Sequence, residues 1–135
     1  MAIRYAVANG NWNAVATWDG GTTLPTVSDT VYSNTFVVTI NQDILVDKIT
    51  NNVCPTTGLS GGSFNVITSR QILCKVESFN NTCLNITGIV SVTTGELIPI
   101  NARCVYFYVN NVGIATLNVL GDCYASTTSN VDRKS

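Results

Sequence analysis

Hydrophobic and polar residues alternate over short stretches along most of the chain, and turn-forming residues separate these stretches. Alternation with a period of two is the pattern of a β-strand, and no stretch shows a convincing helical pattern. Thr, Asn, Val, Ser, Gly and Ile are abundant, which favours strands and turns over helices. The sequence therefore predicts an all-β fold. The expected strands are Arg4 to Val7, Thr30 to Tyr32, Phe36 to Asn41, Ile44 to Thr50, Phe64 to Thr68, Ile72 to Phe79, Cys83 to Val92, Arg103 to Val109 and Ile114 to Leu120.

Asn-Asn pairs begin at positions 51, 80 and 110, so they are spaced by 29 and then 30 residues. A Cys follows the first two pairs at the same distance, at Cys54 and Cys83. A period near 30 is typical of a β-solenoid or β-helix-like stack, in which one recurrent turn lies above the next. Asn suits such a turn because it tolerates left-handed backbone angles and its amide can bond to the amide above. The alternative is an antiparallel β-sandwich with Asn-rich hairpins.

Length and charge exclude several classes of protein function. A chain of 135 residues forms one domain. Only 11% of the residues are charged, and 7 basic residues nearly balance 8 acidic ones, so we expect no nucleic-acid partner. The first nine residues lack the apolar core of a signal peptide, and no later run is long enough to span a membrane. We therefore expect synthesis in a cytoplasm without a signal peptide, and no membrane insertion.

The five cysteines have no C-x-x-C spacing, and the chain contains no His. A zinc site would need four of these thiolates to converge. The simpler interpretation is a set of buried, reduced thiols. We expect no metal and no cofactor.

One predicted strand is apolar or aromatic on both faces. Val105, Phe107 and Val109 alternate with Tyr106 and Tyr108. A strand of this kind lies at the centre of a two-layer core or packs against another subunit. We favour the second interpretation. The candidate oligomer contacts are Val105, Tyr106, Phe107 and Tyr108.

The N-terminal third contains both tryptophans, in Gly10-Asn11-Trp12 and Thr17-Trp18-Asp19-Gly20-Gly21, followed by Pro25, Asp29 and a Val-Thr-Ile strand. Over residues 9 to 46 this order resembles the N-terminal segment of G8-type β-solenoid domains. It also resembles the starts of many tailed-bacteriophage virion proteins: fibres, spikes and other head or tail appendages. Members often have Gly or Asp in the turn before the strand, where this chain has Ser33-Asn34-Thr35.

The resemblance implies a structural component of a bacteriophage virion, made in the host cytoplasm, that forms a homotrimer and contacts other virion proteins. Residues 1–46 would then be a cap and attachment segment, 47–125 a repeat-like body and 126–135 a polar tail. Trp12, Trp18, Pro25 and Asp29 would form the cap and close a sheet edge. Alternatively, Trp12 and Tyr106 would stack on a sugar ring of a host surface glycan, as in a carbohydrate-binding adhesion module.

A second alternative is a fragment of a polysaccharide-degrading spike, which would need a pair of carboxylates. Asp43 and Asp47 could share a strand face because their separation is even. A solvated face explains them equally well, and the chain has neither a His nor a nucleophile or phosphate-loop motif. We expect a protein that is not an enzyme.

Overall fold

The computed structural model describes residues 2–78, 82–86, 91–95, 97–99, 105–109, 115–119, 125–127 and 131–134, with side chains described over 2–77 and 92–95. Strands dominate these residues, and a short 3-10 helix, η1 (Val15–Thr17), is the helical element among them. The strands are β1 (Ile3–Tyr5), β2 (Gly10–Asn11), β3 (Thr30–Tyr32), β4 (Val37–Ile40), β5 (Ile44–Thr50), β6 (Ser63–Val66), β7 (Arg70–Ser78), β8 (Thr82–Ile86), β9 (Ser91–Thr94), β10 (Leu97–Pro99), β11 (Val105–Val109), β12 (Ala115–Val119), β13 (Ala125–Thr127) and β14 (Val131–Lys134).

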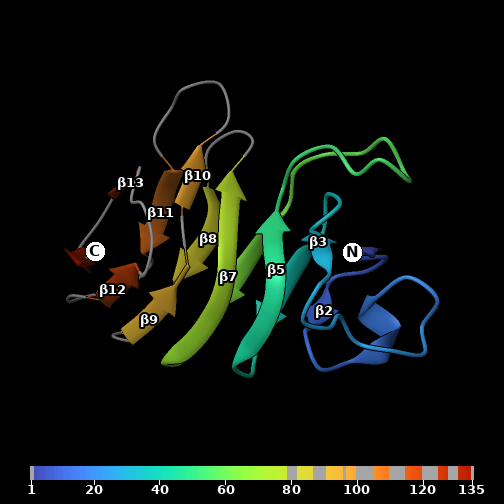
Figure 1. Ribbon diagram of the computed structural model, residues 1–135, viewed down its shortest axis with the longest axis horizontal. Helices are drawn as coiled ribbons and strands as arrows, with labels where there is room; N and C mark the ends of the chain where they lie inside the picture. The colour runs from blue at the N-terminus through green and yellow to red at the C-terminus, as the bar shows by residue number, and fades with distance from the viewer. Residues whose placement is uncertain are drawn as a thin grey trace.

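The strands form two sheets. The larger sheet has eight strands in the order β1-β3-β5-β7-β9-β12-β14, with β10 also paired to β7, and the smaller has six in the order β13-β11-β8-β6-β4-β2. From β1 to β9 the chain alternates between the two sheets, one strand at a time. Figure 1 shows the strands following one another along the long axis, from β2 and β3 near the N-terminus to β12 and β13 near the C-terminus.

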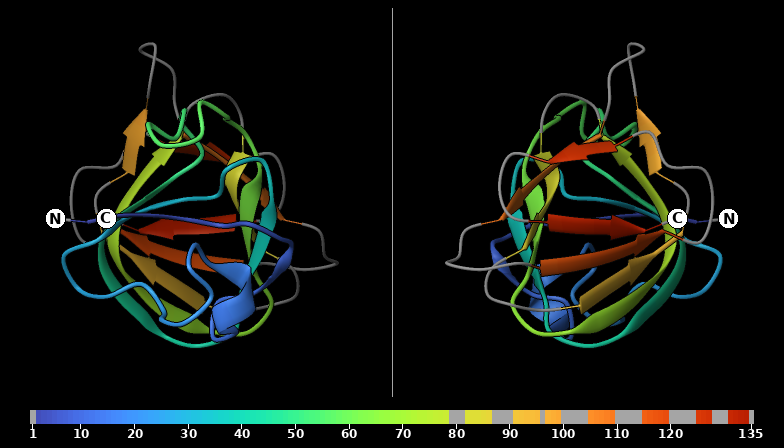
Figure 2. Two further views of the ribbon diagram at one scale, coloured as in Figure 1. Left: turned by 90° about the vertical axis from the view of Figure 1, so that its right-hand side faces the viewer. Right: turned by 90° about the vertical axis from the view of Figure 1, so that its left-hand side faces the viewer.

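Within the described residues, every pair of named strands is parallel. Parallel partners cannot be joined by a two-residue hairpin, so each must be reached by a longer connection. Figure 2, seen along the long axis, shows such connections linking one sheet to the other. The alternative of an antiparallel sandwich built from hairpins is therefore wrong.

The prediction of an all-β fold is confirmed, whereas its finer form, a β-solenoid or β-helix-like stack, is corrected. Within the described residues, the strands form two parallel sheets without closure, which does not establish a solenoid. The registers also differ between neighbours: Ile44 pairs with Ile72, 28 positions later, but Thr30 pairs with Lys48, 18 positions later. The sequence spacing of Asn pairs could not reveal this, because it reports where turns occur and not which strands pair.

Two of the three Asn-Asn pairs that suggested a repeat, at 80–81 and 110–111, lie outside the described residues. Asn51 of the first pair is buried, and its carbonyl accepts a hydrogen bond from the Gly61 amide at 2.9 Å. The division into a cap over 1–46, a body over 47–125 and a tail over 126–135 stays a prediction.

The core follows from strand alternation and register. In β4, Val38 and Ile40 are buried while Val37 is exposed. The register with β6 sets Val38 beside Phe64 and Ile40 beside Val66, so buried side chains form continuous rows from strand to strand. The buried cluster includes Ala6, Trp12, Trp18, Val31, Val38, Ile40, Ile44, Val46, Ile49, Phe64, Val66, Ile72, Cys74, Val76 and Val92.

Candidate functional site: the N-terminal cap

The outer edge of β1 is covered by the chain itself. β1 pairs with β3 on one side, and on the other side residues 17–19 run antiparallel to it through a bridge between Ala6 and Trp18. The Val7 amide donates to the Thr17 carbonyl at 2.8 Å, and the Asp19 amide donates to the Tyr5 carbonyl at 3.0 Å. An edge strand that would otherwise present free backbone groups to another chain is thereby paired.

The first strand of the smaller sheet, β2, is covered by the same segment. The Asn11 carbonyl accepts hydrogen bonds from the Ala14 amide at 3.2 Å and from the Thr17 hydroxyl at 3.0 Å. Gly10 leaves room for this approach, because a Cβ at that position would collide with Oγ1 of Thr17 in its present position. One segment therefore covers the first strands of both sheets.

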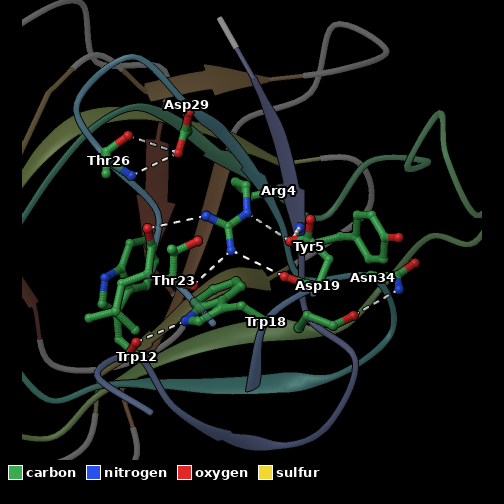
Figure 3. Close-up of polar contacts among 11 residues, drawn as sticks. Arg4, Tyr5, Trp12, Trp18, Asp19, Thr23, Thr26, Asp29 and Asn34 are labelled. Atoms are coloured by element: carbon green, nitrogen blue, oxygen red, sulfur yellow. Dashed lines mark hydrogen bonds and ion pairs between the residues drawn. The ribbon is translucent and has the colours of Figure 1, made fainter. Parts of the chain in front are cut away.

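The side chains of both tryptophans in this segment are buried in the core. Trp12 and Trp18 are 1% and 0% exposed. Their ring centroids are 5.0 Å apart at an interplanar angle of 72°, an edge-to-face arrangement. The Trp18 indole Nε1 donates to the Trp12 carbonyl at 2.8 Å (Figure 3), and the Trp12 ring also lies 6.4 Å from that of Phe64. The pair thus ties the covering segment to the common core.

An ion pair fastens the segment at its end. Arg4 Nε donates to Oδ1 of Asp19 at 2.8 Å, and the Tyr5 amide donates to the same oxygen at 3.1 Å. The two outer guanidinium nitrogens of Arg4 reach the carbonyls of Leu24 at 3.1 Å and Thr23 at 2.8 Å (Figure 3). A planar guanidinium with five donors suits such a fork of acceptors. Arg4 therefore holds both the covering segment and the loop that follows it.

The other two predicted cap residues lie on the way to β3. Asp29 is buried, and its Oδ2 accepts hydrogen bonds from the amide of Thr26 at 2.7 Å and its hydroxyl at 3.2 Å. The Asp29 amide in turn donates to the Thr26 carbonyl at 3.0 Å, so the two residues close the turn reciprocally. Pro25, just before this turn, is also buried. All four predicted cap residues therefore lie buried in the N-terminal segment.

The burial of Trp12 corrects its alternative assignment as a sugar-stacking platform. A ring that is 1% exposed offers no face to a ligand. The other candidate for stacking, Tyr106, has a side chain outside the described part of the chain.

The register of β11 divides the candidate oligomer contacts into two rows. Phe107 pairs with Leu84, which pairs with the buried Phe64. Tyr108 pairs with Asn85, which pairs with the half-buried Asn65. By register, Phe107 continues the row of Phe64, and Tyr108 continues the row of Asn65, which we call the outer row.

The remaining candidates, Val105 and Tyr106, also lie in β11. Val105 pairs with Ala125 of β13, and the pairing with β8 shifts between Tyr106 and Phe107. Because of this shift, Tyr106 cannot be assigned to a row from the positions of Phe107 and Tyr108.

Acidic side chains in the described residues make structural contacts. Oε1 of Glu77 accepts from Lys48 Nζ at 3.2 Å, and its Oε2 accepts from the Thr50 hydroxyl at 2.9 Å. Asp43 Oδ1 accepts a hydrogen bond from the backbone N–H of Gln71 at 3.1 Å, and Asp47 Oδ1 lies 4.0 Å from Lys75 Nζ. No group of three or more metal-ligating residues occurs in the described ranges.

Of the five cysteines, Cys54 and Cys74 have described side chains, and both are buried, free thiols. Burial raises the pKa of Cys74 to about 12, and the nearby Asp47 carboxylate also raises it. A thiol held neutral in this way is a poor nucleophile.

Arg4 is the residue that sequence reasoning missed at this site. The visible signal was an arginine in the first predicted strand and an aspartate directly after Trp18, both in a chain with few charges. A separation of 15 residues matches no helix or strand period, so the sequence does not indicate that the two residues are in contact. The antiparallel bridge brings them together.

Comparisons with protein-family models, with curated proteins and with solved structures found no match to this chain. Within the residues that the structure describes, no helix is long and apolar enough to cross a membrane.

Proposed function

We propose that this protein is a structural subunit of a virus particle, of the tailed-phage type that its first third resembles, and that it works as a homo-oligomer. The observation that carries the proposal is the N-terminal cap, in which residues 12–19 cover the first strands of both sheets. Two buried tryptophans and an ion pair stabilise this cover. The residues that gave the resemblance thus have a shared role in ending the sheets.

A covered first edge has a consequence for assembly. Parallel sheets bury most of their surface and resist association only where their edges are blocked. Blocking the edge at β1 and β2 prevents pairing there and leaves association to other surfaces. This suits a subunit with a defined geometry of self-contact.

The outer row of the smaller sheet is the surface we assign to self-contact. It runs through Asn11, Thr39, Asn65, Asn85 and Tyr108 in register. Its first members are short polar residues, whereas Tyr108 adds a large ring that is well suited to interfaces. We therefore place the oligomer contact at the Tyr108 end of the row, away from the cap.

Light scattering of the purified protein tests the proposal. We expect a mass of three chains of 14.4 kDa each, in line with the homotrimer that the resemblance implies. Tyr108→Lys should release monomers with an unchanged far-UV spectrum, because it adds a charge to the contact. Thr39→Lys is the matched control in the same row, and its mass should stay that of the wild type. A monomeric wild-type protein would overturn the proposal, and so would equal effects of the two variants.

A further inference from the structure

The two sheets have two ends, and the N-terminal cap covers one of them. In the described part of the chain, β14 ends the larger sheet with β12 as its neighbour, and β13 ends the smaller sheet with β11 as its neighbour. Figure 1 shows the C-terminus at the opposite end of the long axis from the cap. An edge strand with free backbone groups can pair with a second copy of the chain, so this end needs protection of its own.

The strand β14 is rich in charge for this protein. Asp132, Arg133 and Lys134 follow one another within its four residues, whereas 11% of the whole chain is charged. Charged side chains on an edge strand are one of the means by which native proteins prevent pairing between sheets. The other edge strand, β13, is only three residues long, and a short edge offers few hydrogen bonds to a partner. Both edges therefore have features that oppose pairing.

The register gives Arg133 a particular position in β14. Arg133 pairs with Leu117 of β12, which pairs with Val92 of β9, and Val92 is fully buried. By register, Arg133 therefore continues the row of Val92. A strand added beyond β14 would extend this row and enclose the guanidinium charge between neighbouring strands. Burying a charge without a partner is costly, so Arg133 opposes the addition of a strand.

A second copy of the chain meets like charges at this edge. Because the cap covers the first strands of both sheets, two copies can join end to end only tail to tail. Two identical edges related by a two-fold axis form an antiparallel pair, and the central residue lies opposite its own copy. A pair centred on Asp132, Arg133 or Lys134 therefore sets like charges opposite each other, which is destabilising. The pair centred on Arg133 also sets Asp132 opposite Lys134, but it encloses two guanidinium groups in the row of Val92.

We infer from this geometry that β14 is a charge-blocked edge, which keeps the sheets of two copies from joining end to end. It complements the N-terminal cap, which blocks the other end through backbone pairing. Arg133 is the main determinant, because its charge opposes pairing both by its burial and by its position opposite its own copy. Association is then limited to the sides of the sheets. The inference holds for any oligomeric state that forms through those sides.

Removal of the charges from β14 tests this inference. The variant combines Asp132→Thr, Arg133→Val and Lys134→Thr, which replace the charged residues with residues that favour strands. As protein concentration rises, we expect light scattering to give twice the mass of the wild type, with an unchanged far-UV spectrum. The mass should stop at twofold, because a two-fold contact between tails is closed and the cap still covers the other ends.

A matched pair of single variants separates the position of a charge from its loss. Arg133→Val removes one positive charge from the edge, and Lys75→Val removes one from β7, which has neighbours on both sides. The Lys75 side chain is 50% exposed. Arg133→Val should also raise the mass, whereas Lys75→Val should leave it at the wild-type value. This pair carries the test if the triple variant does not fold.

Three results would overturn the inference. A wild-type mass for both the triple variant and Arg133→Val would show that the charges do not block the edge. An equal rise with Lys75→Val would assign the effect to net charge. Growth beyond twofold would show that the cap does not close the other end. Each variant is compared with the wild type, so these results are distinct from the wild-type mass that tests the proposed function.

Discussion

Asn34 and Thr35 stand in the left-handed region of backbone space, with φ values of 54° and 70°. Asn tolerates this region, but a β-branched residue there is strained. Surrounding contacts hold the turn: Asn34 Nδ2 donates to the Ala6 carbonyl at 2.9 Å, and the Thr35 amide donates to the Gly61 carbonyl at 3.1 Å. This turn therefore ties β1 to the loop between β5 and β6.

The tight packing of this loop makes Gly62 indispensable. Gly62 has a φ of +82°, and a Cβ there would collide with the Phe36 carbonyl oxygen and lie 2.8 Å from the Phe36 nitrogen. Gly58, in the same loop, has a φ of +74° but open space around it. In urea unfolding, Gly58→Ala should cost about 1 to 2 kcal/mol for the backbone strain alone, and Gly62→Ala more than about 3 kcal/mol. Equal losses would contradict the predicted clash.

Cys74 should make stability depend on alkaline pH. Burial raises its pKa from 9.0 to about 12, so the unfolded chain loses the thiol proton first. The unfolded state is then favoured as pH rises, and stability present below pH 9 is lost between pH 9 and about 12, by about 1.4 kcal/mol per pH unit. Unfolding free energies across this range should fall less steeply for Cys74→Ala. Parallel pH profiles for the two proteins would contradict the effect.

At the scale of the element, β1 is a strand of three residues with a paired neighbour on each side. The neighbours are β3 on one side and residues 17–19 on the other. So short a strand has little intrinsic stability. Its position depends on the Arg4 to Asp19 pair, whose side chains are 11% and 23% exposed. A partly buried, hydrogen-bonded pair of this kind is worth more than an ordinary surface ion pair.

A double-mutant cycle measures this contribution. Asp19→Asn should destabilise the protein by about 1 to 3 kcal/mol, because it leaves the Arg4 guanidinium without its charge partner. In an Arg4→Met background the same change should cost less, which gives a coupling energy of about 1 to 2 kcal/mol. The measurement is chemical unfolding of the four proteins. Additive effects would show that the two side chains do not stabilise the edge together.

Local sequence patterns predicted the strands better than their partners. The bounds Thr30–Tyr32 and Ile44–Thr50 agree with β3 and β5. The expected strand Cys83 to Val92 instead corresponds to parts of β8 and β9, which belong to different sheets. Strand alternation depends on neighbours in sequence, whereas parallel pairing joins residues such as Ile44 and Ile72, which nothing local connects.

The candidate sites show the same limit. Trp12 and Trp18 were recognised because aromatic residues in a motif are visible in the sequence, but their burial distinguishes anchoring from ligand binding. Arg4 was not recognised, because its significance depends on a bridge that brings it beside Asp19, 15 positions later in the sequence. Features that depend on neighbours in the sequence could therefore be predicted, whereas features that depend on contacts between distant residues could not.

At the scale of the whole molecule, parallel pairing also governs how the chain can fold. Partners in the two sheets are separated by many residues, from Ala115 with Val131 to Gly10 with Val38. No hairpin joins the named strands within the described residues. Each pairing must therefore close a loop before any contact stabilises it.

This topology predicts slow folding that can be followed at the cap. Folds dominated by non-local pairing form in milliseconds to seconds, slower than helical bundles. Trp12 and Trp18, both buried, are the tryptophans of the chain, so stopped-flow fluorescence reports when the cap closes. We expect the main refolding phase at about 1 to 1,000 s⁻¹.

Double-jump experiments separate this phase from proline isomerisation, which takes about 10 to 100 s at 25 °C. A brief unfolding pulse leaves the three prolines in their native isomers, and the main phase should persist unchanged. If the full fluorescence change were instead complete within microseconds, the cap would form from local contacts alone. Long-range pairing of β2 with β4 and of β1 with β3 would then not be required to bury the two tryptophans.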